Sequence, residues 1–226
     1  MIEVKDVSKS FGRVQALRNI TINFERGKVY GLIGPNGAGK TTFFECLAGL
    51  MDYSGSIDYS QHDIRNHIAY LPTNPTFLTL ITGKEHLQLL CNARRVTKPN
   101  FRISNIFNLP LNRFVTSYST GMKKKLAFTA ILMQKNELFL LDEPFNGVDI
   151  QSNILLTEII HRLKQANKTV IISSHILSSL SSVCDNFILL KEGKIHKIVG
   201  KDAFNELEAD LIKNEVSNKL EHLIIR

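Results

Sequence analysis

Cysteine is scarce in this sequence: 226 residues contain three, Cys46, Cys91 and Cys184, and none forms a CxxC pair. Isolated cysteines of this kind exclude a disulfide framework and are typical of a reduced, cytosolic protein. No apolar run approaches the ~18 residues that cross a bilayer. Charges also interrupt the first residues, where a signal peptide would need an apolar core. We therefore expect a cytoplasmic protein with no transmembrane segment of its own.

Acidic residues are scarce in one part of the chain. From Lys84 to Lys125 there are nine basic residues and a single acid, Glu85, so this segment carries a charge of +8 in a protein of net charge +7. Such a charge fits an ordinary solvated surface, or a surface that faces a partner or anionic lipid heads. Nucleic acid is not expected as a partner, because no exposed aromatic residues are interleaved for base stacking.

What the sequence does contain is a glycine-rich stretch, residues 34–42, which reads GPNGAGKTT. It follows an apolar run at 29–33 and precedes a helical pattern, which is the strand–loop–helix order of a phosphate-binding loop. Glycines let backbone N–H groups point at phosphates, and the helix dipole favours the same negative charge. We expect Lys40 to reach the β- and γ-phosphates and the Thr41 hydroxyl to bind Mg²⁺. The nucleotide-binding positions in this stretch are Gly34, Pro35, Asn36, Gly37, Ala38, Gly39, Lys40, Thr41 and Thr42.

Strand and helix patterns alternate along the rest of the chain. Strands are expected at residues 2–4, 20–24, 29–33, 55–59, 68–71, 138–141, 169–174, 187–190 and 195–199. Helices are expected after the phosphate-binding loop and at residues 83–93, 121–135, 154–163 and 202–226, whereas 96–116 resists assignment. This alternation predicts an α/β fold with a largely parallel sheet, whose ligand lies at the carboxyl ends of the strands.

Polar residues directly follow two of the buried strands. Asp142 and Glu143 end the apolar run at 138–141, and His175 follows the strand at 169–174. These ends should meet the phosphate-binding loop at one edge of the sheet. We expect Asp142 to hold Mg²⁺ through water and Glu143 to orient or deprotonate the attacking water. His175 is placed to touch the γ-phosphate.

The order of these motifs resembles the ATP-binding subunit of ABC transporters, over about residues 2–200. GPNGAGKTT matches the Walker A motif, and LFLLDEP at 138–144 matches Walker B with its catalytic glutamate. YSTGM at 118–122 stands in the place of the signature motif, NGVD at 146–149 matches the D-loop, and His175 matches the switch histidine.

The resemblance implies a head-to-tail dimer that sandwiches two ATP molecules. Each ATP would be held by one chain's phosphate-binding loop and by Ser119 and Gly121 of the other chain, with Asp149 of the D-loop nearby. The start of a helix at Ser119 fits this role, because it offers N–H donors and a positive dipole end. Phe11 falls at the family's adenine-stacking aromatic, with an ordinary core position as the alternative.

Two departures from the family pattern stand out. Thr120 replaces the first glycine of the signature motif, and Met122 replaces its glutamine. The Q-loop glutamine, which would contact Mg²⁺ and couple the site to the membrane partner, is absent: Thr73 and Asn74 follow Pro72. A Thr73 hydroxyl or an Asn74 amide is available to substitute, and we assign Thr73 to the metal site beside Thr41 and Asp142.

The resemblance implies a P-loop NTPase core with a mostly parallel sheet, an N-terminal antiparallel β subdomain and a short inserted helical subdomain. The ABC ATPase domain would span residues 1–200, with the helical subdomain at about 83–120 and a C-terminal helical tail at 201–226. With ATP and Mg²⁺ as cofactors, it would form a homodimer or heterodimer and drive an integral-membrane permease at the inner face of the cell membrane. YLP near residue 70 and YSTGM near 120 look most like ATPases of ABC-2-type exporters. The alternatives are a non-transport ABC ATPase and a poorly hydrolytic regulatory nucleotide-binding module.

Overall fold

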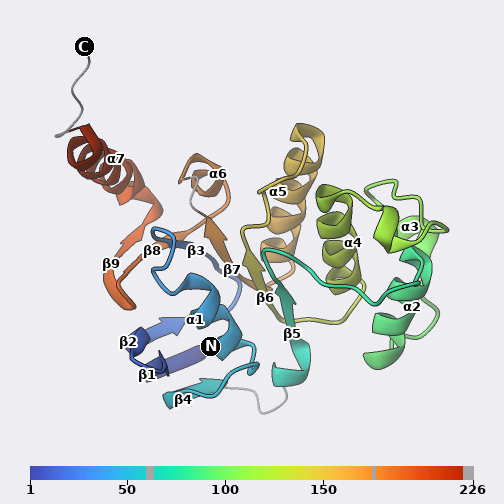
Figure 1. Cartoon of the computed structure of the whole chain (residues 1–226), viewed down its shortest axis with the longest axis horizontal. Coiled ribbons are helices and arrows are strands. Elements are labelled where there is room, and N and C mark those ends of the chain that lie inside the picture. Colours follow the sequence, from blue (N-terminus) through green and yellow to red (C-terminus); the bar gives the residue numbers. More distant parts are fainter. Residues whose placement is uncertain (60–63, 175–176, 221–226) are drawn as a thin grey trace.

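Two sheets and their covering helices make up the protein (Figure 1). The computed structural model describes residues 1–59, 64–174 and 177–220. The strands are β1 Ile2–Phe11, β2 Val14–Phe24, β3 Val29–Ile33, β4 Ser54–Tyr59, β5 Ile68–Leu71, β6 Leu138–Asp142, β7 Thr169–Ser174, β8 Asn186–Lys191 and β9 Lys194–Gly200. The α-helices are α1 Lys40–Leu47, α2 Gly83–Ala93, α3 Phe101–Ser104, α4 Thr120–Leu132, α5 Ile150–Gln165, α6 Leu177–Ser181 and α7 Phe204–Leu220.

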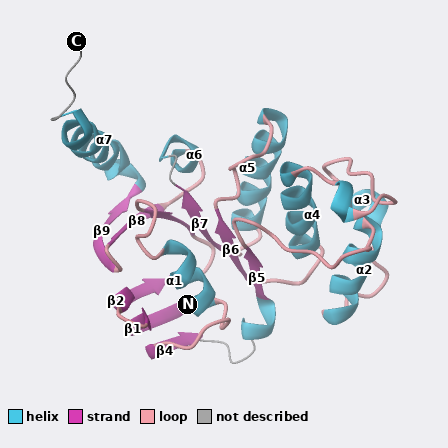
Figure 2. Cartoon of the chain, in the orientation of Figure 1, coloured by secondary structure: helices cyan, strands magenta, loops and turns pink. Residues whose placement is uncertain are grey.

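The larger sheet has the strand order β5-β6-β7-β3-β8-β9 and is parallel except for the antiparallel edge strand β9. Every residue of β3, β6 and β7 is buried, as expected for parallel strands covered on both faces. Alternate residues of β6 face opposite sides: Leu140 packs in the core that contains Phe43 of α1, and Leu141 packs in the core that contains Leu156 of α5. Figure 2 shows the strands between these helices. The predicted α/β class with a mostly parallel sheet is confirmed.

The smaller sheet is antiparallel, with the order β2-β1-β4. Its buried side chains, among them Val4 and Phe24, join the core on the α1 side of the larger sheet. The predicted N-terminal antiparallel unit is therefore confirmed, although β1 and β2 are longer than the sequence indicated. The extra length contains bulges between paired residues, and such irregularities interrupt the alternation by which a strand is recognised.

A small helical region holds the third apolar core, at the end of the molecule opposite α7 (Figure 1). Helix α2 begins with a capping box, in which Thr82 accepts from the backbone N–H of Glu85 and the Glu85 side chain accepts from the backbone N–H of Thr82. Leu87 of α2 packs in this core with Leu126 of α4. The stretch that resisted assignment, 96–116, contains the single-turn helix α3, which is too short to show a helical period.

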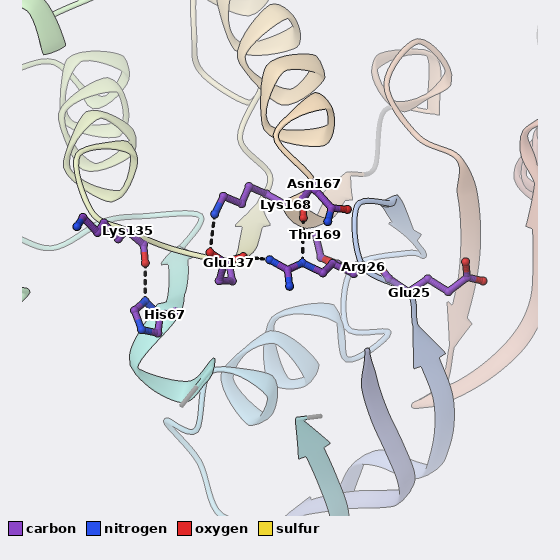
Figure 3. Close-up of polar contacts among 8 residues, drawn as sticks. All are labelled: Glu25, Arg26, His67, Lys135, Glu137, Asn167, Lys168 and Thr169. Carbon is purple, nitrogen blue, oxygen red and sulfur yellow. Dashed lines mark hydrogen bonds and ion pairs between the residues drawn. The ribbon is translucent and has the colours of Figure 1, made fainter. Parts of the chain in front are cut away.

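An ion-pair network ties together the amino ends of the central strands (Figure 3). Glu137, just before β6, pairs with Arg26 at 2.7 Å and with Lys168 at 2.5 Å. Arg26 precedes β3 and Lys168 precedes β7, and Arg26 Nε also donates to the carbonyl oxygen of Asn167 at 3.4 Å. The network therefore joins three neighbouring strands at the edge of the sheet away from the phosphate-binding loop.

All three cysteines are buried with free thiols. Burial, opposed by the charge of Lys9 and aided by that of Glu45, raises the pKa of the Cys46 thiol to about 11. In the part of the chain that the structure describes, no helix combines the length and the apolar character needed to cross a bilayer.

Candidate nucleotide-binding and hydrolysis site

The phosphate-binding loop connects β3 to α1, as predicted. Gly37 and Gly39 have φ angles of 80° and 106°, which L side chains rarely adopt. Gly34 is needed for a different reason: a Cβ there would lie 2.2 Å from the carbonyl oxygen of Leu190. Helix α1 begins at Lys40, so its first N–H groups and the positive end of its dipole lie at the loop. The loop has the backbone that anion binding requires.

Lys40 points back into its own loop. Its ammonium donates to the carbonyl oxygens of Gly34 at 2.7 Å and Pro35 at 3.2 Å, and the side chain is 8% exposed. Burial lowers the pKa of Lys40, whereas the charges of Glu143 and Asp142 raise it. The ammonium thus lies between the loop and two carboxylates, the region where phosphate oxygens would enter.

Asp142 is the centre of the polar cluster at the end of β6. Its Oδ2 accepts from the hydroxyls of Thr41 at 2.7 Å and Thr73 at 2.9 Å. Its Oδ1 accepts from the hydroxyl of Ser173 on the neighbouring strand β7. Carboxylate and hydroxyl oxygens are the hard donors that Mg²⁺ binds. The structure thus brings together Thr41, Thr73 and Asp142, the three residues that the sequence analysis assigned to the metal, and their chemistry fits this ion.

Glu143 follows Asp142 in an unusual backbone conformation. Its φ is 51°, in the left-handed region that a residue with a Cβ seldom occupies. Its N–H is bonded to Ser173, with the hydroxyl oxygen at 3.0 Å and the carbonyl oxygen at 3.2 Å. Non-glycine residues in this region cost about 1–3 kcal/mol and cluster at functional sites. The turn places Glu143 beside the phosphate-binding loop.

Together these elements surround a hollow of about 500 Å³. Its lining residues are Ala16, Asn36, Gly37, Ala38, Gly39, Lys40, Thr41, Thr42, Thr73, Asp142, Glu143 and Asn146. Sequence reasoning missed Ala16 and Asn146 as lining residues. Ala16 comes from the smaller sheet, and its carbonyl oxygen would lie 2.6 Å from a Cβ on Gly39. No local pattern could have indicated that contact. Asn146 was visible in the D-loop match.

Other candidate residues lie away from this hollow. Phe11 ends β1, is 48% exposed and has the Lys9 ammonium 5.4 Å from its ring centroid, so its ring is available at the surface. Gly34 and Pro35 contribute carbonyl oxygens to Lys40 instead of lining the hollow. The predicted switch histidine, His175, lies outside the described residues.

The signature residues also lie outside the hollow. Ser119 is exposed and is the N-cap of α4, where its hydroxyl accepts from the backbone N–H of Met122 at 3.2 Å. Gly121, in the first turn of α4, lies against the D-loop: a Cβ there would be 2.7 Å from the carbonyl oxygen of Gly147. A glycine is therefore required at 121 by packing within the chain itself.

Asp149 does not line the hollow either; it is the N-cap of α5. Its carboxylate accepts from the backbone N–H and the hydroxyl of Ser152, each at 2.9 Å, and pairs with Lys125 at 2.9 Å. The hydrogen bond from Lys125, followed by those from Ser152, lowers the pKa of Asp149. This cap explains why α5 begins at Ile150, four residues before the predicted start.

A glycine-rich loop folded around a lysine, beside a strand-end aspartate that gathers hydroxyls, defines a P-loop nucleotide-binding protein. The family model described as ABC transporter matches residues 17–146. The chain belongs to this family, as an ATP-binding subunit of an ABC transporter.

Individual relatives agree with this assignment. The chain is 33% identical to the lantibiotic transport ATP-binding protein SrtF of Streptococcus pyogenes, with 96% of this chain and 97% of that protein covered. A solved ATP-binding subunit of an ABC transporter matches with a TM-score of 0.84 and 27% identity, covering 96% of this chain and 99% of that one. The dimeric ATP-binding cassette MJ0796, solved in a post-hydrolysis state with ADP and Pi, shares the fold at a TM-score of 0.79 and 20% identity, covering 89% and 99%.

Proposed function

We propose that this subunit is a Mg²⁺-dependent ATPase that dimerises on ATP and drives a separate membrane permease. The observation that carries the proposal is the cluster around Asp142, which joins the hydroxyls of Thr41 and Thr73 to a carboxylate next to Glu143. Mg²⁺ held there by Asp142, Thr41 and Thr73 would neutralise charge on the phosphates when bound.

Two further roles are proposed from residues that line the hollow. Lys40 binds the β- and γ-phosphates after exchanging its bonds to the loop carbonyls for bonds to phosphate oxygens. Glu143 accepts a proton from the attacking water, or orients it, at the edge of the same hollow. For His175 at the γ-phosphate and Phe11 at the adenine ring, the proposal is supported by the sequence motifs alone.

The positions of the signature residues support the proposal that the subunit dimerises on ATP. Ser119 is exposed at the start of α4 but lies outside its own chain's hollow, so it is available to the γ-phosphate of an ATP bound by a second copy or a related subunit. Gly121 and Asp149 would lie at the same junction. The solved relative MJ0796 is a dimer bound to ADP and Pi, which is the state that such a pairing would reach after hydrolysis.

The surface between β5 and the helical region supports the proposal of a permease partner. A second hollow there, of about 250 Å³, is lined by residues 75–79, by Val115 and Thr116, and by Lys123. Large apolar side chains are exposed beside it, including Leu78 at 62% and Phe114 at 51%. We propose that the permease docks here, at the inner face of the membrane, and that it is of the ABC-2 export type.

The test is ATP hydrolysis by the purified protein with Mg²⁺, compared with a Glu143→Gln variant. We expect the variant to bind ATP and accumulate as a dimer on size exclusion, with phosphate release reduced by about 10²- to 10⁴-fold. Glu158→Gln is the matched control, because Glu158 lies on the exposed side of α5 in an ion pair with Arg162. Wild-type turnover by Glu143→Gln would refute the role of Glu143. No phosphate release by the wild type, even with permease-containing membranes, would favour a regulatory nucleotide-binding module instead.

A further inference from the structure

We propose that Lys124 is a positioning residue, which holds the backbone of Glu143 in the conformation that hydrolysis needs and links it to the signature helix α4. The inference rests on the proposed function, because it assigns Lys124 a role in ATP hydrolysis through Glu143. In the sequence, Lys124 is only the middle of three consecutive lysines in a basic segment. In the structure, Lys124 differs from an exposed basic residue because it is buried.

The Lys124 ammonium is buried under the turn that carries Glu143. It donates to the carbonyl oxygens of Glu143 and Asn146, both at 2.8 Å, and the side chain is 4% exposed. Both carbonyls belong to the turn that leads from β6 toward the D-loop. A buried cation that bonds to backbone oxygens holds main chain in place, which distinguishes it from the solvated lysines of a charged surface.

The Glu143 backbone is held from both sides. Its N–H is bonded to Ser173 of β7, and its carbonyl oxygen accepts from Lys124 of α4. Between these bonds, φ is 51°, a conformation that costs a residue with a Cβ about 1–3 kcal/mol and that the two bonds help to hold. Removing the Lys124 bond would take this donor from the half-buried Glu143 carbonyl and free the turn to relax. The direction of the Glu143 side chain would change with it.

A lysine suits this place because a charged donor makes stronger hydrogen bonds than a neutral one. Burial lowers the pKa of Lys124, and the charges of Glu143 and Asp142 raise it again. The two carboxylates thus favour the ammonium form, the form that donates to both carbonyls.

Helix α4 and the turn also touch through their backbones. Gly121, one helical turn before Lys124, packs against the Gly147 carbonyl, where a Cβ would approach to 2.7 Å. The next lysine, Lys125, pairs with Asp149 at the cap of α5. The start of α4 therefore holds the turn at three successive points, so displacement of Ser119 at its tip is transmitted to Glu143 within one chain.

The experiment compares Lys124→Met, Lys124→Gln and, as a matched control, Lys135→Met in the purified full chain. Lys135 is an exposed lysine just beyond the far end of α4. We expect Lys124→Met to lower kcat by about 10- to 100-fold, the size of effect that a small misplacement of a catalytic group produces. The Kd for ATP should stay within about twofold, because Lys124 does not line the nucleotide hollow. Lys124→Gln, which keeps N–H donors without the charge, should recover most of the rate, and Lys135→Met should match the wild type.

The outcomes separate this inference from the proposed function. Suppose that Glu143→Gln abolishes turnover, but that Lys124→Met hydrolyses ATP as fast as Lys135→Met and has a melting temperature that shows it is folded. The inference about Lys124 is then wrong, whereas the proposed ATPase function is retained. The inference is equally overturned if Lys124→Gln is no faster than Lys124→Met, because the donors would then not be what matters. If the wild type does not hydrolyse ATP, both the proposed function and the inference about Lys124 are wrong. A crystal structure of Lys124→Met supplies a second readout: the inference requires Glu143 to leave the left-handed region, and an unchanged φ would contradict it.

Discussion

Thr41 and Asp142 stand 101 residues apart in the chain, and a hydrogen bond of 2.7 Å joins the Thr41 hydroxyl to Asp142 Oδ2. The bond ties the first turn of α1 to the end of β6. Because Thr73 donates to the same oxygen at 2.9 Å, the end of β5 is held at the same point. If these oxygens hold Mg²⁺ as proposed, removing one hydroxyl should change the Mg²⁺ dependence of ATP hydrolysis.

Replacing Thr73 by valine keeps the shape of the side chain and removes the hydroxyl. We expect the Mg²⁺ concentration for half-maximal ATPase activity to rise about fivefold, which corresponds to a loss of about 1 kcal/mol from one polar contact. The measurement is a Mg²⁺ titration at saturating ATP. Thr97→Val, at an exposed threonine beyond α2, is the control. An unchanged Mg²⁺ dependence would show that Thr73 has no part in the metal site.

Alanine at Gly121 should destabilise the protein even without nucleotide. Alanine favours a helix over glycine by about 1 kcal/mol, but the added Cβ would lie 2.7 Å from the Gly147 carbonyl oxygen, and overpacking of that kind costs about 1–3 kcal/mol. The two effects oppose each other, and we expect the clash to prevail. Thermal unfolding measures the result.

The control for this change is Gly200→Ala. Gly200 has φ of −76° and ψ of 173°. Among the described residues, apart from its chain neighbours, no atom would lie within 4 Å of a Cβ added there. A Gly121→Ala protein as stable as Gly200→Ala would mean that α4 and the D-loop do not pack as closely as the structure indicates.

The substitution Ser119→Asp tests the proposed contact with a second subunit's ATP while keeping the N-cap of α4. Aspartate is as good an N-cap as serine, so the melting temperature of the monomer should be unchanged. Its negative charge would face the γ-phosphate of the second subunit's ATP, so dimer formation by the Glu143→Gln background should be lost on size exclusion. Asn100→Asp, at the exposed N-cap of α3, where the side-chain oxygen accepts from the Ile103 N–H, is the control. Dimers that persist in Ser119→Asp would place the γ-phosphate contact elsewhere.

Glu137 should make the free energy of unfolding depend on pH in the acidic range. Burial raises the pKa of Glu137. This effect is outweighed by the hydrogen bond and charge of Lys168 and by the charges of Arg26 and His67, so the pKa lies below its ordinary value of 4.5. A lowered carboxyl pKa stabilises the fold above the ordinary value, and this stability is lost as pH falls through the lowered pKa. At neutral pH we expect Glu137→Gln to cost about 1 kcal/mol, or about 2–4 °C in melting temperature.

Two further observations test the Glu137 prediction. The difference between wild type and Glu137→Gln should shrink as pH falls well below 4.5, because both side chains are then neutral. Glu158→Gln, which breaks an exposed pair within one helix, should shift the melting temperature far less. A difference that stays constant down to the acid limit would contradict the assignment of the pKa to the ion pairs in Figure 3.

The core of the site was predictable because each of its parts has a local pattern. The apolar run of β6 ending in Asp142 and Glu143 is visible in five or six letters, and the rule that ligands bind at strand ends supplies the rest. Thr73 was found through an absence, since it stands where the family has a glutamine. The fold class followed from the alternation of short apolar runs with helical patterns.

What could not be predicted depends on contacts between distant residues. Ser173 and Lys124 hold the Glu143 turn from β7 and α4, 30 and 19 residues away in sequence, and neither has a local signature. Lys124 in particular was hidden in a basic run that favours an exposed surface. The start of α5 was misplaced because Asp149 was assigned to the D-loop, whereas its carboxylate also caps the helix.

The ion pairs of Arg26, Glu137 and Lys168, drawn in Figure 3, lie at the amino ends of the central strands, whereas the nucleotide hollow lies at their carboxyl ends. The ion pairs and the hollow therefore share no residue. A change at Glu137 can alter the melting temperature while every side chain that lines the hollow is left as it is.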